Sequence, residues 1–242
     1  MSEKTTPKTT NLVDELFKVG AHFGFVKSRR HPSAKTFIFG SKNNIEIFDL
    51  EKTRVELEKA LEFIEKKGEE NASILFAGGK SEARTAITGA GQALSMPYVA
   101  GRWIGGSLTN FPEIKKRIAR LEELTTQRER GELGKYTKKE RLLIDRDIEK
   151  LTIYFGGLSA MKFLPKAVIV IDPKKESIAV AEAKKMKIPV VALAGSDSNL
   201  HEIDYPIPGN DSSRQNIGYI TNLIVEAYKK GKANSQLPAN NI

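Results

Sequence analysis

The sequence predicts an α/β protein with a doubly wound, flavodoxin-like parallel sheet of about five strands, interrupted by an inserted antiparallel coiled-coil helical hairpin. Short, almost wholly apolar segments alternate with amphipathic ones, as expected for strands that helices cover on both faces. A long charged segment in the middle carries a helical repeat. Paired glycines, Gly105-Gly106 and Gly156-Gly157, flank this segment. We therefore expect an α/β body (residues 11–106 and 156–232), a hairpin (107–155) and flexible tails (1–10 and 233–242).

The composition is that of a soluble globular protein with a polyanionic partner. Apolar residues make up 40% and charged residues 29% of the 242 positions, which suits one domain plus an insertion. Thirty-nine basic and 30 acidic residues leave a net charge of +9, which favours a polyanion as partner. The absence of cysteine excludes disulfides, thiolate metal sites and a cysteine nucleophile. No apolar run is long enough to span a bilayer and no signal core is present, so we expect neither membrane contact nor secretion.

The N-terminal region combines a short helix with a basic segment. The apolar spacing from Leu12 to Val19 predicts an amphipathic helix that ends at Gly20. Between Glu15 and Glu46 there is no acidic residue, while basic and aromatic residues alternate. A proline disfavours helix there, so we expect an irregular basic loop. After it, the strand-like segments Lys35–Phe39 and Ile45–Phe48 are separated by turn residues and predict a β-hairpin.

The rest of the body alternates helices and strands. A helix capped at Asp49 runs to Lys67, where Gly68 ends it. The remaining elements follow in order: strand Ser73–Phe76, helix Ser81–Leu94, strand Pro97–Ala100, and, after the hairpin, strand Ala167–Ile171, helix Ile178–Met186, strand Ile188–Ala194 and helix Asn216–Lys230. Right-handed crossovers between these strands give the doubly wound sheet.

The inserted arm extends from Phe111 to Phe155. Its apolar residues step by 4, 3 and 4 on each limb, which predicts the narrow seam of a helical hairpin: Ile114, Ile118, Leu121 and Thr125, then Ile144, Ile148, Leu151 and Phe155. Thr137 and Glu140 form a capping-box pattern at the start of the second helix. Basic residues cover the arm together with acidic ones, so a solvated, salt-bridged coil and a polyanion-binding arm both remain open.

A phosphate-binding turn is one candidate site. Gly78-Gly79-Lys80-Ser81 follows a strand and opens a helix, where backbone N–H groups suit an anion. The P-loop pattern, however, requires glycine at the position of Ile74, and Gly89-Ala90-Gly91 lies inside a helix. A tight strand-to-helix turn is therefore favoured over catalytic nucleotide binding, while an RNA phosphate on the same amides stays open.

Metal, catalytic and stacking sites find less support. The candidates for a divalent ion are His22, Asp197 and Asp204, but their spacing matches no known ligand set, so we expect no metal and no cofactor. Neither a Gly-x-Ser-x-Gly elbow nor a His-Glu-x-x-His pair is present, so we expect no catalytic residue. Arg102-Trp103 could stack on a base. We assign Trp103 mainly to packing and Arg102 to binding.

Two longer motifs resemble a known family. One is the stretch RW-x-GG-x-LTNF from Arg102 to Phe111, and the other is IDYPIPGND from Ile203 to Asp211. They occur in order with Ala21–Gly24, Phe37–Gly40, Ile47–Thr53, Ile74–Phe76, Thr137–Glu140, Gly156–Leu158 and Ile188–Ala192. Together, from about Leu12 to Lys230, these segments resemble the bacterial and organellar small-subunit ribosomal protein S-two family.

The resemblance implies a structural, non-catalytic protein. It implies partners: small-subunit ribosomal RNA, neighbouring ribosomal proteins and the large mRNA-binding protein S-one, whose docking it supports. It also implies a cytoplasmic, ribosome-bound protein, with the organellar matrix as the alternative, and no homo-oligomer. Phe25 stands where the family often has histidine, which removes one metal-ligand candidate. The competing hypothesis is a nucleotide- or sugar-phosphate-binding α/β enzyme.

The first hypothesis assigns roles to two sets of residues. We expect RNA contacts, mainly to phosphates, from Lys27, Arg29, Arg30, Lys35, Lys80, Arg84, Arg102, Asn110, Lys138 and Lys139. The joint that orients the arm is expected at Trp103, Gly105, Gly106, Gly156 and Gly157.

Overall fold

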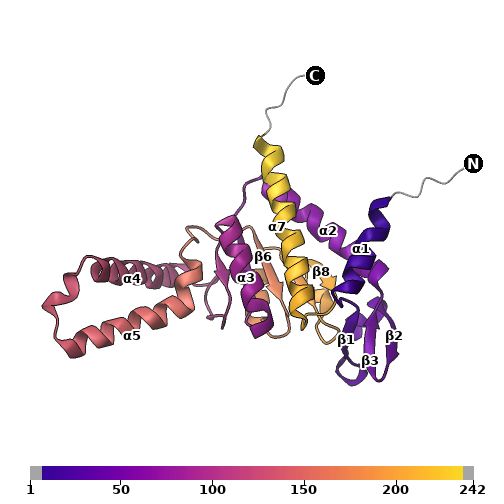
Figure 1. Ribbon diagram of the computed structural model, residues 1–242, viewed down its shortest axis with the longest axis horizontal. Coiled ribbons are helices and arrows are strands. Elements are labelled where there is room, and N and C mark those ends of the chain that lie inside the picture. The colour runs from indigo at the N-terminus through magenta and orange to yellow at the C-terminus, as the bar shows by residue number, and fades with distance from the viewer. Residues whose placement is uncertain (1–6, 237–242) are drawn as a thin grey trace, which may run out of the picture.

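A five-stranded parallel sheet, a three-stranded antiparallel sheet and a projecting helical hairpin make up the molecule (Figure 1). The computed structural model describes residues 7–236. The hairpin and the small sheet lie at opposite ends of the long axis. The predicted tails fall partly outside this range, at residues 1–6 and 237–242, while helix α1 begins at Pro7 and α7 ends at Gln236.

The large sheet has the predicted doubly wound topology. Its strands are β4 (Ile74–Ala77), β5 (Tyr98–Val99), β6 (Ala167–Ile171), β7 (Val190–Ala194) and β8 (Tyr205–Pro208). They pair in the order β5-β4-β6-β7-β8, all parallel. This is the flavodoxin-like order, in which the chain starts near the middle of the sheet and winds outward in both directions. Every residue of β4, β6 and β7 is buried, which explains their continuous apolar sequences.

Helices cover both faces of this sheet. On one face, α1 (Pro7–Lys18), α2 (Leu50–Glu69), α3 (Ser81–Leu94) and α7 (Arg214–Gln236) pack on Ile74, Phe76, Ile169 and their neighbours. The other face, with Leu75, Val168 and Val170, packs on α6 (Ser177–Lys185) and on the root of the hairpin. Because the side chains of a strand alternate between faces, each strand contributes to both cores. The apolar seam of the hairpin is thus continuous with one body core.

Strand β8 was not predicted, because it contains Pro206 and Pro208. It lies at the edge of the sheet, beside β7. Gly209 donates its N–H to the carbonyl of Ala194, so the odd-numbered N–H groups face β7. The two prolines, which have no N–H, therefore face the open edge. Proline at these positions costs no ladder bond and blocks further strand pairing.

The small sheet corrects part of the prediction for the basic segment. Strands β1 (Phe23–Val26), β3 (Ile45–Phe48) and β2 (Ile38–Lys42) pair antiparallel in that order. The β2–β3 hairpin is confirmed, and positive φ at its two asparagines, Asn43 and Asn44, forms the tight turn. Phe23–Val26, predicted as irregular loop, is a strand, and the start of the predicted first strand, Lys35–Phe37, lies in a 3₁₀ helix instead.

The hairpin consists of α4 (Phe111–Glu129) and α5 (Lys138–Phe155), joined through a 3₁₀ turn at Glu132–Lys135. The predicted seam is buried except at one place, where Leu124 replaces Thr125 as the inward residue of α4. The capping box is present: the Thr137 hydroxyl accepts from the Glu140 N–H, and the Glu140 carboxylate accepts from the Thr137 N–H.

A buried carboxylate on α6 fixes the root of the hairpin. Glu182 Oε1 accepts from the Trp103 indole N–H at 3.2 Å and from the Gly106 N–H at 2.7 Å. Its Oε2 accepts from the Leu108 N–H at 2.9 Å and from the N–H and hydroxyl of Thr109 at 3.1 and 3.3 Å. Five donors thus converge on one side chain and bind the loop before α4 to the body.

Two of the four predicted joint glycines are required by the backbone. Gly106 has φ +91°, a conformation that L side chains rarely adopt. A Cβ on Gly157 would overlap the carbonyl of Tyr98 on β5, because the segment after α5 packs directly on that edge strand. A Cβ on Gly105 would meet no atom within 4 Å, and one on Gly156 would make only an ordinary contact with Thr152. The arm therefore has one bent root strand and one closely packed one.

Replacing Glu182 by glutamine should destabilise the fold. The amide keeps one acceptor oxygen but turns an NH₂ group toward backbone N–H donors, so we expect a loss of about 2–3 kcal/mol in the free energy of unfolding. Urea unfolding at pH 7 measures this loss. Glu51→Gln, on the exposed side of α2, is the matched control and should change stability by less than about 0.5 kcal/mol.

The loss should also depend on pH in a defined direction. Burial alone would raise the pKa of Glu182, but the N–H groups of Leu108, Gly106 and Thr109 and the Trp103 indole hold it below the ordinary value of 4.5. The stabilisation by the ionised group is therefore complete above about pH 4.5 and is lost as pH falls through the lower folded-state pKa. The difference between the native chain and Glu182→Gln should shrink over that range. A pH-independent difference would contradict this role.

Candidate nucleic-acid interface

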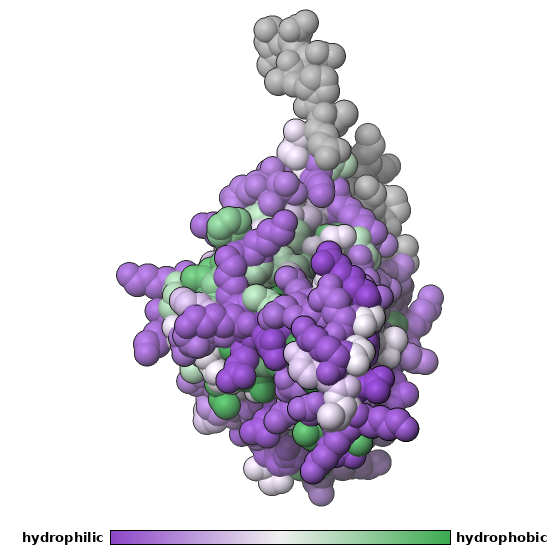
Figure 2. All heavy atoms as spheres, turned by 90° about the vertical axis from the view of Figure 1, so that its left-hand side faces the viewer, coloured by the Kyte–Doolittle hydropathy of each residue, from purple (hydrophilic) through white to green (hydrophobic). Residues whose placement is uncertain are grey.

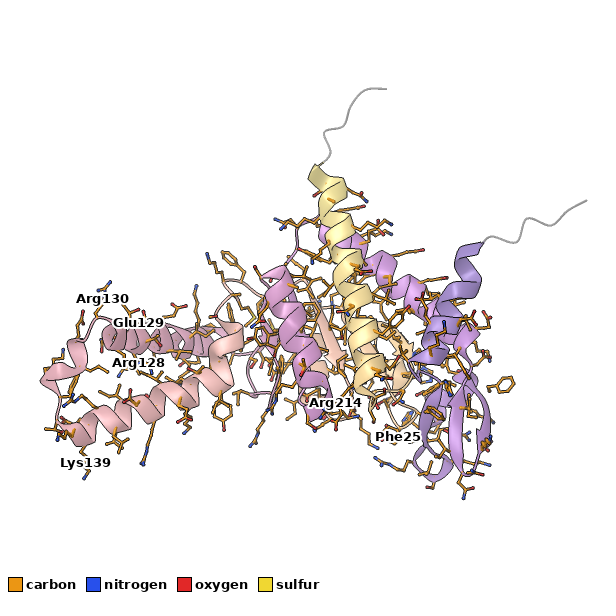
Figure 3. The ribbon with its side chains drawn as sticks, in the orientation of Figure 1. Phe25, Arg128, Glu129, Arg130, Lys139 and Arg214 are labelled. Carbon is orange, nitrogen blue, oxygen red and sulfur yellow. The ribbon has the colours of Figure 1, made fainter. Side chains whose placement is uncertain are left out.

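The far end of the arm presents cations without internal partners. Arg128 and Arg130 lie at the end of α4 and Lys139 at the start of α5, on the part of the arm most distant from the body (Figure 3). Within the described residues, Arg128, Lys138 and Lys139 form no ion pair, and Arg130 only approaches Glu132 at 3.9 Å. Viewed toward the tip, the surface is mostly hydrophilic (Figure 2). Cations of this kind are free to neutralise phosphates.

The helix end at the tip is not itself available to an anion. The capping box at Thr137 and Glu140 already uses the first free N–H groups of α5. The bonds from the N–H and hydroxyl of Thr137 hold the pKa of Glu140 below its ordinary value, so a carboxylate already occupies the position that a phosphate would take. A polyanion would therefore be held at the tip by the side chains of Lys138, Lys139 and their neighbours.

The basic segment near the small sheet divides into structural and free cations. Arg30 forms an ion pair with the buried carboxylate of Glu46 at 2.9 Å, and it therefore supports the fold. Arg29 pairs with Asp197 at 3.2 Å and lies over the Phe25 ring at 4.7 Å, yet it stays half exposed. Lys27 and Lys35 are exposed and form no ion pair within residues 7–236.

Lys80 is enclosed by carboxylates at the carboxyl ends of the parallel strands. Its ammonium lies 2.7 Å from Asp172, which follows β6, and 3.2 Å from Asp211, which follows β8. Burial lowers the pKa of Lys80, but the two carboxylates outweigh it and raise the pKa above the ordinary value, so the lysine stays charged. Lys80 thus joins three strand ends, and the sequence-based prediction that it contacts RNA lacks support from this geometry.

The phosphate-type turn is likewise occupied from within. The Gly79 N–H donates to the buried carboxylate of Glu176 at 3.0 Å, and a Cβ on Gly79 would clash with that carboxylate. Burial raises the pKa of Glu176. The adjacent hollow of about 480 Å³ is lined by acidic and basic side chains together, including Asp172, Lys174 and Asp197. A nucleotide phosphate therefore has no free amide at this turn to bind.

The three metal candidates are not brought together. Asp197 follows β7 at the carboxyl edge of the sheet, whereas Asp204 precedes β8 at the opposite edge and accepts from the Val190 N–H. His22 lies between the rings of Phe17 and Phe23, away from both. In the part of the chain that the structure describes, no group of three or more potential ligands can hold a metal ion.

The remaining predicted contacts surround the root of the arm. Arg84, Arg102 and Asn110 are exposed there, with the Arg84 guanidinium donating to the Ala100 carbonyl at 3.2 Å. Arg84 also lines a hollow of about 560 Å³ between α3, β5 and the end of α5. Trp103, in contrast, is buried in the core beneath this surface.

Four residues that organise these regions were missed by sequence reasoning. They are Glu182 at the root and Asp172, Glu176 and Asp211 at the carboxyl edge. Glu182 had a detectable signal, since it is a lone carboxylate among the alanines and valine on the inward face of α6. The other three follow strands, where acidic residues are common in loops, so only the structure distinguishes them.

No helix within residues 7–236 is long and apolar enough to cross a membrane.

Comparison with known proteins agrees with the arm, the sheet order and the motifs. The model of the ribosomal protein S2 family matches residues 16–231. Curated proteins named small ribosomal subunit protein uS2 are similar over most of their length. The one from Acidothermus cellulolyticus is 43% identical over 90% of this chain and 79% of its own. That from Thermus thermophilus is 42% identical over 88% and 84%, and that from Sulfurimonas denitrificans 42% over 90% and 85%.

The family model covers nearly the whole chain, and these relatives share about two-fifths of its residues across both the body and the arm, so the protein belongs to the ribosomal protein S2 family.

Proposed function

We propose that this member of a family of structural, non-catalytic ribosomal proteins joins small-subunit ribosomal RNA to neighbouring ribosomal proteins. The observation that carries the proposal is the set of unpaired cations at the end of an arm whose root is held to the body by Glu182. A rigid arm transfers the position of the body to a distant RNA segment. The unpaired charges at its tip supply sequence-independent attraction to phosphates.

The RNA contacts fall into three groups. The arm tip contributes Lys138 and Lys139, and the root of the arm contributes Arg84, Arg102 and Asn110. The basic segment contributes Lys27, Arg29 and Lys35, all exposed. Arg30 and Lys80 are excluded from this set, because each is committed to a buried carboxylate. The contacts position the protein on folded RNA and carry little base readout.

Docking of protein S-one is assigned to the other end of the molecule. Strand β2 is an edge of the small sheet, so its outer backbone groups have no partner strand. Phe39 on this strand is 81% exposed, the most exposed of the large apolar side chains described. An exposed aromatic on an open edge suits a protein segment that adds to the sheet and packs on the ring. We place the ribosome-bound protein in the bacterial cytoplasm, with an organelle as the alternative.

Removing the tip cations should weaken RNA binding without affecting the fold. For Lys138→Ala with Lys139→Ala, we expect lower affinity for small-subunit ribosomal RNA. The slope of log affinity against log salt should become shallower by about 1.5–2, because two phosphate contacts are lost. Filter binding over a range of salt concentrations measures both quantities.

Lys59→Ala with Lys67→Ala on α2 is the matched control, since both lysines pair with acidic neighbours, and it should leave the slope unchanged. An unaltered slope in the tip variant, with affinity equal to that of the native chain, would show that the arm tip does not contact phosphates.

Replacing Phe39 by alanine should release S-one from otherwise normal subunits. Because the ring is exposed, the free energy of unfolding should change by less than about 0.5 kcal/mol. We expect variant subunits, purified by sedimentation at moderate salt, to retain the protein itself at normal occupancy but less S-one. Phe163→Ala, an exposed phenylalanine between the arm and β6, is the control. Normal S-one occupancy in the Phe39 variant would refute this docking site.

A further inference from the structure

Three rings at the junction of α1 and β1 form an exposed aromatic stack. The Phe17 ring lies parallel to the His22 ring, with centroids 4.5 Å apart and an interplanar angle of 14°. The Phe23 ring follows at 4.0 Å from His22, tilted by 41°. Phe17 is 61% and Phe23 49% exposed, so the two phenylalanines bound the stack and present open surface to solvent.

The backbone holds this stack in place. Gly20, with φ +75°, makes the sharp turn between helix and strand, and its carbonyl accepts from the Asn210 side chain at 3.0 Å. The Ala21 N–H donates to Leu16 at 2.9 Å, and the His22 carbonyl accepts from Phe48 at 2.8 Å. Bonds on both sides of His22 thus fix the rings before any ligand arrives, which lowers the entropy lost on binding.

The stack supplies aromatic surface without a charge of its own. Burial lowers the pKa of His22, so the ring is neutral at physiological pH. Its Nδ1 is buried and has no hydrogen-bond partner in the structure. A neutral imidazole between two phenylalanines extends their π surface and does not repel a neutral base.

Lysines flank the stack. Lys18 follows Phe17 on α1, and Lys27 follows strand β1; both are exposed and form no ion pair among residues 7–236. No carboxylate occurs in the sequence between Glu15 and Glu46. Exposed rings set among unpaired cations are the pattern with which proteins hold single-stranded nucleic acid: the rings stack on bases and the cations neutralise the backbone.

We propose that the Phe17–His22–Phe23 stack binds an unpaired RNA nucleobase, which stacks on the open face of Phe17. Lys18 and Lys27 neutralise the flanking phosphates. This inference rests on the proposed RNA-binding function and extends it, because it adds a base contact at the small-sheet end to phosphate contacts along the arm. An unpaired base fits better than a protein segment, since the stack is flat, small and surrounded by cations.

The test uses the full chain and two short single-stranded RNA probes of equal length, an oligoadenylate and its abasic counterpart, with fluorescence anisotropy as the readout. For Phe17→Leu, which keeps an apolar side chain but loses stacking, we expect affinity for oligoadenylate to fall about tenfold, with no change on the abasic probe. Phe17→Tyr should retain native affinity. Phe163→Leu, at an exposed ring elsewhere, is the matched control.

Lysine variants separate stacking from charge. Lys18→Ala with Lys27→Ala should weaken both probes alike, because both carry phosphates. Native affinity of Phe17→Leu for oligoadenylate would overturn the proposal, as would an equal loss on the abasic probe. If Phe17→Leu binds RNA normally but loses a ribosomal protein from purified subunits, the stack is a protein contact and the proposal fails. Sedimentation of the same variants with small subunits tests the underlying function separately.

Discussion

The buried carboxylate of Glu182 is the interaction on which the position of the arm depends. It accepts five hydrogen bonds from Trp103 and the segment Gly106–Thr109, and so connects α6 of the body to the loop that starts α4. A buried carboxylate is costly unless it is fully hydrogen-bonded, and a fully bonded one tolerates little movement of its donors. The apolar seam of the arm then extends a body core, so direction is set by hydrogen bonds and stiffness by packing.

The carboxyl edge of the parallel sheet shows why this fold lacks a nucleotide site here. In open α/β sheets, ligands bind at that edge, where strand order reverses. In this protein the edge is filled by its own charges: Glu176 takes the Gly79 N–H, and Asp172 and Asp211 hold Lys80. The interactions that would bind a phosphate instead connect the strand ends. The surfaces left for partners are the arm and the small sheet, at the two ends of the molecule.

Sequence reasoning succeeded where one physical signal dominated. Apolar runs such as Ala167–Ile171 identified buried strands, and the capping box at Thr137 located the start of α5. It failed where signals conflicted. Proline hid strand β8, because its edge position, which makes proline harmless, is a property of the sheet. It also grouped Arg30 and Lys80 with the free cations, since charge is visible in a sequence but the buried partners Glu46 and Asp211 are not.

The sequence by itself determined the class of the fold, the existence of the arm and the family. These follow from periodicity and from local motifs such as the stretch from Arg102 to Phe111, which depend on neighbouring residues in the chain. Only the tertiary structure decided which charges are available and where the arm points. Those properties depend on contacts between distant segments, such as Glu182 with Gly106 or Arg29 with Asp197. The joint at Gly106 was located from the sequence, but the side chain that holds it was not.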